Sequence, residues 1–284
     1  MKKILVEIES DNNFHDINYI KEIDESEFKS IEQSISVIDE VQHLMDLYAV
    51  LAFNFEDFVE FQAKEVLTII EHVNPVNHVG ENEYKFLKVQ INRFTNNYLS
   101  SFRMFIDHSN VKIGKRFQKD SIEYQKFISM TNKAYDKNFS YRFAHKLRNF
   151  CQHCALPISG FNVTGIENGR SFMFYFEKEY LLNEYDSWGV QVKEDLINGP
   201  ESFNVNVVLE SHFRIATKFS TEIHDLYEDK FLDALNYLND YTARFRSDKE
   251  LRIMDEDFDP DSISQITLQK FPFKLIDKFC NGIS

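Results

Sequence analysis

Three polar side chains recur at every fourth position near the middle of the chain. They are His145, Asn149 and His153, and this spacing places them along one face of a helix. Arg142 and Arg148 flank that face. Burying two imidazoles, an amide and two guanidiniums side by side on one helix costs free energy. Such a cluster therefore favours a functional role over simple packing. The spacing therefore predicts a functional polar site on a single helix.

These residue types suit chemistry at a phosphate group. An arginine stays charged at any working pH and grips a phosphate through paired donors. A histidine, which titrates near pH ~6.5, can take a proton from a ribose 2′-hydroxyl or give one to a leaving oxygen. The asparagine can fix the orientation of either group. We therefore expect metal-free cleavage of RNA, with no metal ion and no cofactor.

The segment from Arg148 to His153, RNFCQH, resembles the R-x(4–6)-H signature of the HEPN superfamily, in which asparagine often follows the arginine. HEPN proteins are all-α bundles, and many are metal-independent ribonucleases of toxin, defence or RNA-processing systems. The resemblance implies that Arg148 contacts the scissile phosphate, that His153 is the general acid or base, and that Asn149 supports both. It also implies a homodimer, and a toxin would have an inhibitory partner protein.

Three further residues are expected to bind substrate. Helix geometry alone adds Arg142 and His145, and Lys146 belongs to the basic segment that leads into the motif. One difficulty concerns the pair in the signature itself. Five residues of an α-helix turn by ~500°, which leaves Arg148 and His153 about 140° apart around the axis. They converge only if the helix loosens before it ends, if the arginine bends around it, or if a two-fold dimer brings in residues of a second chain.

Net charge is −14, which at first sight opposes binding to nucleic acid. The distribution is uneven, because residues 111–148 carry ten basic and three acidic side chains. That segment has a local charge of +7 and leaves −21 for the rest of the chain. A basic segment inside an acidic protein focuses polyanion binding on one face. The alternative is a solvated helix face whose lysines pair with acidic neighbours.

The cysteines beside the signature suggest a zinc site or a redox pair. Cys151 and Cys154 form a CxxC pair around His153, but a structural zinc site needs four ligands and only Cys280 remains. A redox pair favours a helix N-terminus, where the dipole lowers the thiol pKa, whereas these cysteines lie at a C-terminus. We therefore expect both to be buried small hydrophobic residues.

The acidic run of residues 255–261 resembles the start of a calcium loop. It has Pro260 at position six and Ile266 at position twelve, where such a loop needs glycine and glutamate. We therefore expect a solvated loop there.

No apolar run approaches the ~20 residues that span a bilayer, and the first residues lack the apolar stretch of a signal peptide. We expect a cytoplasmic protein with no membrane contact. An odd number of cysteines, three, argues against a disulfide scaffold.

Hydrophobic periodicity predicts a mainly α fold, a HEPN-like antiparallel helical bundle with a small β-hairpin or sheet insertion. The aromatic stripes are expected to be core packing. The predicted helices are 39–73, 81–108, 121–135, one from Asn138 or Ser140 to Pro157, and 209–245. Breaks are expected at 74–80 and at a turn over 112–117. Strands are expected near the start, in a hairpin that turns at Asn168-Gly169, at 198–208 and at 263–271.

We expect residues 1–284 to form a single domain, or one bundle with an insertion. Its parts would be a HEPN-like helical core at 39–155, a β-rich insertion at 156–208, a long helix completing the bundle at 209–245 and a C-terminal segment at 246–284. Three functions remain open on this fold. They are ribonuclease catalysis, RNA or protein binding without catalysis, and a polar network that merely ties the helix to its neighbours.

Overall fold

The computed structural model describes residues 2–8, 17–72, 79–166, 169–243, 245, 250–255 and 269–270. The described chain is mainly helical with small antiparallel sheets, which confirms the expected fold class at this coarse level. It divides into two compact units, one formed by Met1–His43 and Leu226–Ser284 and the other by Leu44–Asp225. The boundaries fall inside two long helices, α1 (Glu25–Phe61) and α8 (Val205–Thr242).

The first unit contains an antiparallel sheet with the strand order β2-β1-β6-β7. Its strands are β1 (Lys3–Ile8), β2 (Ile17–Ile23), β6 (Glu250–Asp255) and β7 (Gln269–Lys270). The strand near the start was predicted, but β2 and β6 were not. In β6 the alternate residues Leu251 and Ile253 are buried, which is the period of a strand.

Part of the expected acidic loop is therefore strand. Asp255 is the last residue of β6, and its carboxylate lies 2.8 Å from the Lys3 ammonium on the neighbouring strand. The prediction of a solvated loop is wrong for this residue because a cross-strand partner orders it. The aspartates at 257, 259 and 261 lie outside the described residues, as does most of the strand predicted at 263–271.

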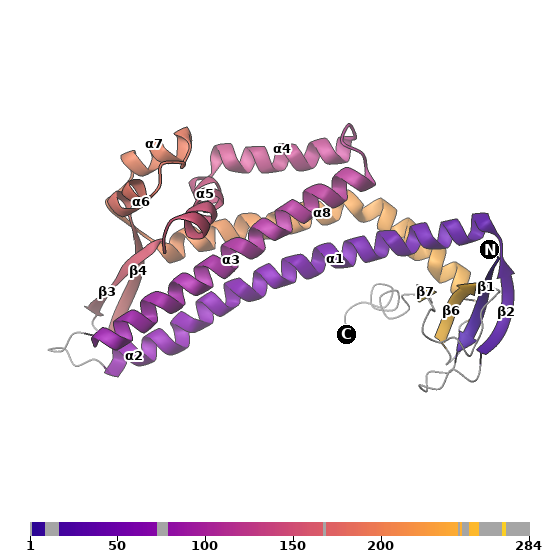
Figure 1. The fold of residues 1–284 in the computed structure, drawn as a ribbon, viewed down its shortest axis with the longest axis horizontal. Coiled ribbons are helices and arrows are strands. Elements are labelled where there is room, and N and C mark those ends of the chain that lie inside the picture. The colour runs from indigo at the N-terminus through magenta and orange to yellow at the C-terminus, as the bar shows by residue number, and fades with distance from the viewer. Residues whose placement is uncertain are drawn as a thin grey trace. The chain divides into compact units, whose positions relative to one another are not determined.

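The second unit holds most of the helices. After α1 come a π-helical turn (Gln62–Val66) and α2 (Leu67–His72), then α3 (Glu81–Arg116), α4 (Ile122–Lys137) and α5 (Phe139–His153). The Tyr124 amide donates to Ser121 Oγ at 3.1 Å, which caps α4 at its start. From the end of α3, α4 runs back toward α5 (Figure 1).

The turn predicted over 112–117 is wrong, because α3 continues to Arg116. In the sequence, Gly114 suggested that the helix ends nearby, yet this glycine lies inside α3. A Cβ on Gly114 would lie 3.2 Å from the ring of Tyr124, so the glycine allows α4 to approach closely. The Phe117 amide still donates to the Ile113 carbonyl at 2.9 Å.

The predicted hairpin is confirmed as β3 (Ile158–Ile166) and β4 (Gly169–Glu177), which pair antiparallel through Ile166 and Gly169. Strand β5 (Ser202–Asn204) is shorter than predicted and completes the sheet in the order β3-β4-β5. The Asn92 side chain of α3 donates to the Ile158 carbonyl and accepts from the Ile158 amide, both at 3.0 Å. These two bonds fix the start of β3 on α3, directly after the predicted stop at Pro157.

Two short helices, α6 (Lys178–Glu184) and α7 (Val190–Asn198), were not predicted. Between them lies the fully buried Trp188, whose indole N–H donates to the Leu181 carbonyl at 2.9 Å. Its ring stacks on Phe143 and Phe150 of α5, each at 5.6 Å between centroids. For these residues, the expectation that aromatic stripes form core packing is confirmed.

Within the described ranges, no helix combines the length and the apolar character needed to cross a bilayer.

Candidate active site

The position of the polar site follows from the apolar stripe of α5. Phe143, Leu147 and Phe150 recur at three- and four-residue spacing and are completely buried. An amphipathic helix buries its apolar stripe and directs its remaining side chains to the rim and to solvent. Residues 145, 148, 149 and 153 therefore lie outside the core by the same periodicity that fixes the helix.

The structure separates the two residues of the predicted signature. Arg148 is half-buried, whereas His153 is exposed at the last residue of α5. The helix does not loosen before it ends, because the Cys154 amide still donates to the Phe150 carbonyl at 2.9 Å. Regular helical geometry thus keeps the two side chains about 140° apart within one chain.

Asn149 lies beside the arginine, as the sequence suggested. Its amide oxygen accepts from Arg148 Nη1 at 3.3 Å, a long bond that orients the guanidinium only loosely. The Nε atom of Arg148 is buried and makes no hydrogen bond to the described residues. Its Nη2 makes no hydrogen bond to the described residues either and is not buried, so the arginine retains donors that a ligand can reach.

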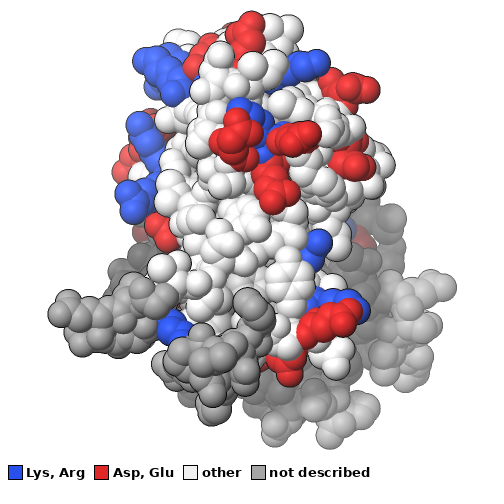
Figure 2. Space-filling view, turned by 90° about the vertical axis from the view of Figure 1, so that its left-hand side faces the viewer, with Lys and Arg blue, Asp and Glu red and all other residues white. Residues whose placement is uncertain are grey.

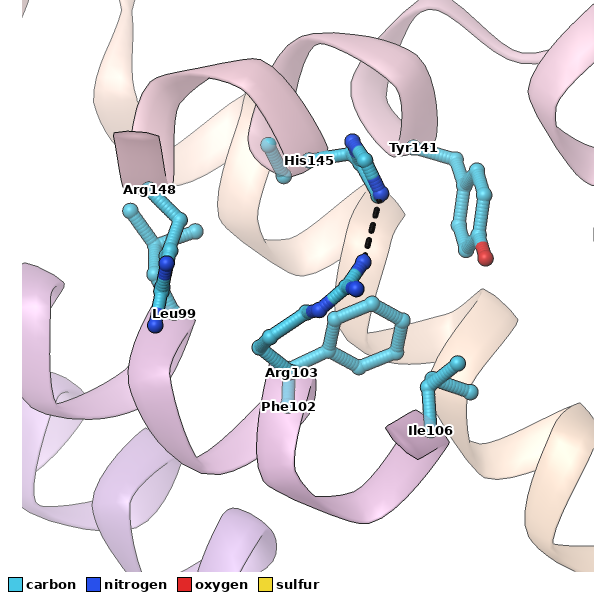
Figure 3. Close-up of a pocket in the computed structure, with 8 residues that line it drawn as sticks. Leu99, Phe102, Arg103, Ile106, Tyr141, His145 and Arg148 are labelled. Carbon is cyan, nitrogen blue, oxygen red and sulfur yellow. Dashed lines mark hydrogen bonds between the residues drawn. The ribbon is translucent and has the colours of Figure 1, made fainter. Parts of the chain in front are cut away.

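Arg148 lines a hollow between α3 and α5. The lining residues are Leu99, Phe102, Arg103, Ile106, Tyr141, Ala144, His145 and Arg148, and the cavity volume is ≈ 10 Å³, room for about one water molecule. In Figure 3, Arg148 extends from α5 toward Leu99 of α3, and Arg103 extends from α3 toward His145. We refer to this space as the α3–α5 hollow. It has an apolar floor and two guanidiniums.

His145 is held neutral in this hollow. Arg103 Nη1 lies 2.7 Å from His145 Nε2, and because a guanidinium only donates, that ring nitrogen must accept. The proton of the neutral imidazole is then on Nδ1, which is buried without a partner among the described residues. Burial lowers the pKa of His145, and the positive charges of Arg103, Lys146 and Arg148 lower it further, while Asp107 opposes them. His145 is thus an acceptor for Arg103 rather than a third positive charge.

Arg103 is fixed from two sides. Its Nε donates to Asp107 Oδ2 at 2.7 Å, one helical turn along α3, and its Nη1 donates to His145. Two of its five N–H donors are thus used, and its side chain is 40% exposed. This residue was not predicted from the sequence. The available signal was an arginine with an i, i+4 aspartate beside the aromatic stripe of α3.

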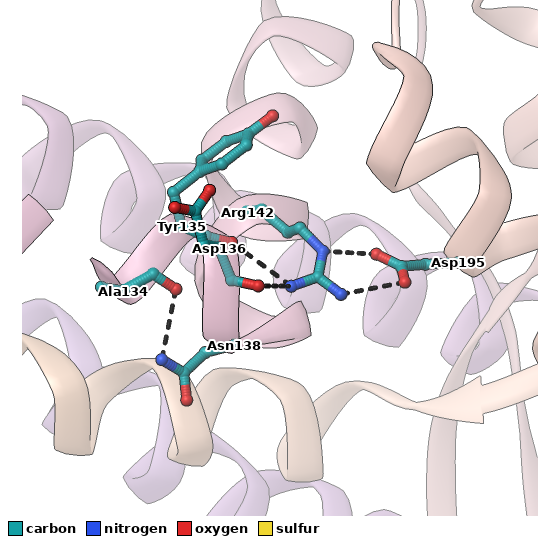
Figure 4. A network of polar contacts seen from close by, with 6 residues as sticks. All are labelled: Ala134, Tyr135, Asp136, Asn138, Arg142 and Asp195. Atoms are coloured by element: carbon teal, nitrogen blue, oxygen red, sulfur yellow. Dashed lines mark hydrogen bonds and ion pairs between the residues drawn. The ribbon is translucent and has the colours of Figure 1, made fainter. Parts of the chain in front are cut away.

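Arg142, which was predicted to bind substrate, is already engaged by the protein (Figure 4). Its Nε and Nη2 donate to the two carboxylate oxygens of Asp195 on α7, the latter at 2.9 Å. Its Nη1 donates to the carbonyls of Tyr135 and Asp136, near the end of α4, at 3.3 Å. This guanidinium ties three helices together, and its carboxylate partner raises the pKa of Arg142.

Lys146 also lies away from the α3–α5 hollow. A Cβ on Gly189 would meet Lys146 Cε at 3.4 Å, so the lysine stem lies along the loop before α7. Gly189 has a φ of +79°, which a residue with a side chain rarely adopts. The substrate-binding role expected of Lys146 therefore has no support from the lining of the hollow.

The two neighbouring cysteines differ from each other. Both are free thiols. Cys151 is largely buried, and burial raises the pKa of its thiol to about 12, as expected of a small hydrophobic residue. Cys154 is exposed, so the prediction that both are buried is wrong for it, because α5 ends at His153 and Cys154 follows it out of the helix. Among the described residues, no three His, Cys, Asp or Glu side chains group around a possible metal position.

A buried pair of hydrogen-bonded side chains, Tyr98 and His212, packs against residues that line the hollow. Tyr98 Oη and His212 Nδ1 share a hydrogen bond of 2.6 Å, and the ring of His212 contacts Phe102 edge-on at 4.2 Å between centroids. His212 is completely buried, which lowers its pKa to about 3. Because Phe102 and Tyr141 also line the hollow, this pair supports its floor.

Comparison of this chain with protein-family models, with curated proteins and with solved structures finds no match.

Proposed function

We propose that this protein is a metal-independent endoribonuclease of the HEPN type that acts as a homodimer. The observation that carries the proposal is the state of Arg148. Its guanidinium lines a solvent-reached hollow and has no carboxylate partner among the described residues, whereas Arg142 on the same helix has one. A phosphodiester is a ligand of the right charge and shape for such a guanidinium.

The proposed reaction is transesterification. His153 takes the proton of a ribose 2′-hydroxyl, and the 2′-oxygen attacks the adjacent phosphorus. The bond from phosphorus to the 5′-oxygen breaks, and that oxygen takes a proton from the imidazolium or from solvent. Arg148, with Asn149 beside it, stabilises the negative charge that grows on the phosphate oxygens. The products carry a 2′,3′-cyclic phosphate and a 5′-hydroxyl.

Dimerisation is part of the proposal because one chain does not bring the two groups together. Arg148 faces the hollow, and His153 projects from the exposed end of α5 on another side of the helix. A two-fold axis beside α5 would bring the imidazole of one chain to the guanidinium of the other. We propose a toxin or antiviral effector as the setting, with an inhibitory partner protein, on the HEPN resemblance alone.

The decisive experiment incubates single-stranded RNA with purified protein in EDTA. We expect cleavage that survives the chelator, yields cyclic phosphate ends and disappears in His153→Ala. The matched control is His108→Ala, an exposed histidine on α3 that lies outside the motif. Light scattering reports the oligomeric state in parallel. Intact RNA with the wild-type protein, or full activity in His153→Ala, would refute the proposal.

A second candidate, an RNA- or protein-binding module without catalysis, is favoured by the separation of Arg148 from His153 around α5. In that case the acidic remainder of the chain would meet a basic partner. The face in Figure 2 offers no continuous acidic field for this, since positive and negative side chains are interspersed around a wide uncharged area. RNA that binds with strong salt dependence but stays intact would select this candidate.

A further inference from the structure

We infer that Arg103 binds a second phosphate of the RNA, next to the scissile one, so that the substrate backbone crosses the mouth of the α3–α5 hollow between two guanidiniums. This inference rests on the proposed function and adds a substrate-binding residue that no sequence motif supplies. Its first support is position, because Arg103 of α3 and Arg148 of α5 line the same hollow.

The second support is donor capacity. Asp107 takes Nε of Arg103 and His145 takes one N–H of Nη1, which leaves the second N–H of Nη1 and both of Nη2 without a partner among the described residues. Both N–H groups of Nη2 are among these donors, so the planar guanidinium keeps N–H groups that can bind the oxygens of a phosphate. The side chain is 40% exposed, so a ligand can reach it.

The third support is preorganisation. Asp107 at 2.7 Å and His145 at 2.7 Å hold the guanidinium in place before a ligand arrives. The bond to His145 requires an acceptor, so the neutral imidazole orients Arg103 without adding charge. Among the described residues, the carboxylate that pairs with Arg103 is that of Asp107, and it is 49% exposed and thus well screened. The hollow therefore keeps a net attraction for anions.

A purely structural role explains these contacts less well. An exposed i, i+4 ion pair contributes little to stability, and the same helix would hold without it. Arg142 is an arginine with a structural role in this protein, because a bidentate carboxylate and two backbone carbonyls accept its hydrogen bonds. Arg103 is also held in place, but three of its five N–H groups have no partner among the described residues.

The test compares two substrates that differ only in flanking phosphates. One is a dinucleoside monophosphate, which carries the scissile phosphate alone, and the other is the same dinucleotide with a phosphate at each end. We expect Arg103→Gln to lower kcat/KM roughly tenfold for the flanked substrate and to lower it much less for the unflanked one. Arg93→Gln, a control on the exposed face of the same helix, should change neither. Equal losses on both substrates, or no loss on either, would overturn the inference.

A binding measurement separates this inference from the proposed function. A 2′-O-methyl oligonucleotide cannot be cleaved by transesterification, so its affinity is independent of catalysis. Removing one phosphate contact should reduce the slope of log K against log salt by about 0.7 in Arg103→Gln but not in Arg93→Gln. If the wild type cleaves nothing yet this difference appears, the proposed function fails and the phosphate site stands. An unchanged slope in a folded Arg103→Gln refutes the site even if the enzyme is active.

Two further arms close the remaining alternatives. Arg103→Lys keeps the charge but loses the planar fork, so it should restore the salt slope and recover only part of the affinity. If Arg103→Gln does not fold, Arg103→Lys takes its place in the test. A salt slope that falls by about 0.7 in Arg103→Lys, although the charge is kept, would then refute the site. Inorganic phosphate at constant ionic strength should not displace the oligonucleotide at millimolar concentration, and displacement that requires Arg103 would assign the hollow to free phosphate instead.

Discussion

Arg142 and Arg148 lie six residues apart on the same helix, and the structure uses them in opposite ways. Arg142 meets a bidentate carboxylate and two backbone carbonyls, and its side chain is 14% exposed. Arg148 meets one amide oxygen at 3.3 Å and otherwise faces a hollow. The comparison teaches that partners across the fold, rather than residue type, separate a structural arginine from one available to a ligand.

The largest expected effect is the loss of RNA cleavage in the variant Arg148→Gln. If this guanidinium stabilises the transition state, its loss should lower kcat by about 10²–10³-fold. The free energy of unfolding should change by less than about 1 kcal/mol, because the residue has one long hydrogen bond to lose. RNA cleavage rates and urea unfolding measure the two quantities. A stability loss as large as that of Arg142→Gln would erase the contrast between the two arginines.

Arg142→Gln is expected to behave in the reverse manner. Removing it leaves Asp195, which is 27% exposed, without its partner and frees two carbonyls, so we expect a loss of about 2–3 kcal/mol in the free energy of unfolding. The variant should keep most of its RNA cleavage below its unfolding temperature. A double-mutant cycle with Asp195→Asn measures the coupling. Little coupling together with lost cleavage would instead return Arg142 to the substrate-binding residues.

The buried pair of Tyr98 and His212 predicts how the stability of the protein depends on pH. Burial lowers the pKa of His212 to about 3, so between pH ~6.5 and 3 the unfolded chain binds a proton there that the folded chain does not. Stability should therefore fall with falling pH, and this residue contributes a slope of about 1.4 kcal/mol per pH unit. The groups that face it are Tyr98, Tyr141 and His145.

His212→Asn keeps a polar atom near Nδ1 and removes the titration. Urea unfolding from pH 7 to 5 should show a shallower slope of stability against pH in this variant than in the wild type. Identical slopes in the two proteins would mean that His212 is accessible to protons in the folded chain.

The smallest expected effect belongs to Asn149→Ala. Its bond to Arg148 is long, so it orients the guanidinium weakly, and we expect cleavage to fall by less than about tenfold with unfolding unchanged. Steady-state kinetics on the same RNA measure it. A loss that equals that of Arg148→Gln would show that the amide contacts substrate directly.

The hydrophobic periodicity of the sequence predicts much of the secondary structure. The stripes of α3, α4 and α5 and the alternation of β3 and β4 could be predicted because each pattern acts over neighbouring residues. Gly114 misled because glycine favours turns in isolation, while its actual use is the approach of Tyr124. The short helices α6 and α7 were missed because they hold few turns of periodicity and are fixed by the burial of Trp188.

The sequence by itself determined α5, its apolar stripe and the polar residues opposite that stripe, because the 3.6-residue period needs no distant partner. Only the tertiary structure decided which of those residues are free to bind. Packing brings Arg103 to His145 across 42 positions and Asp195 to Arg142 across 53. Such pairings depend on which helices lie side by side, and no local pattern of residues encodes that.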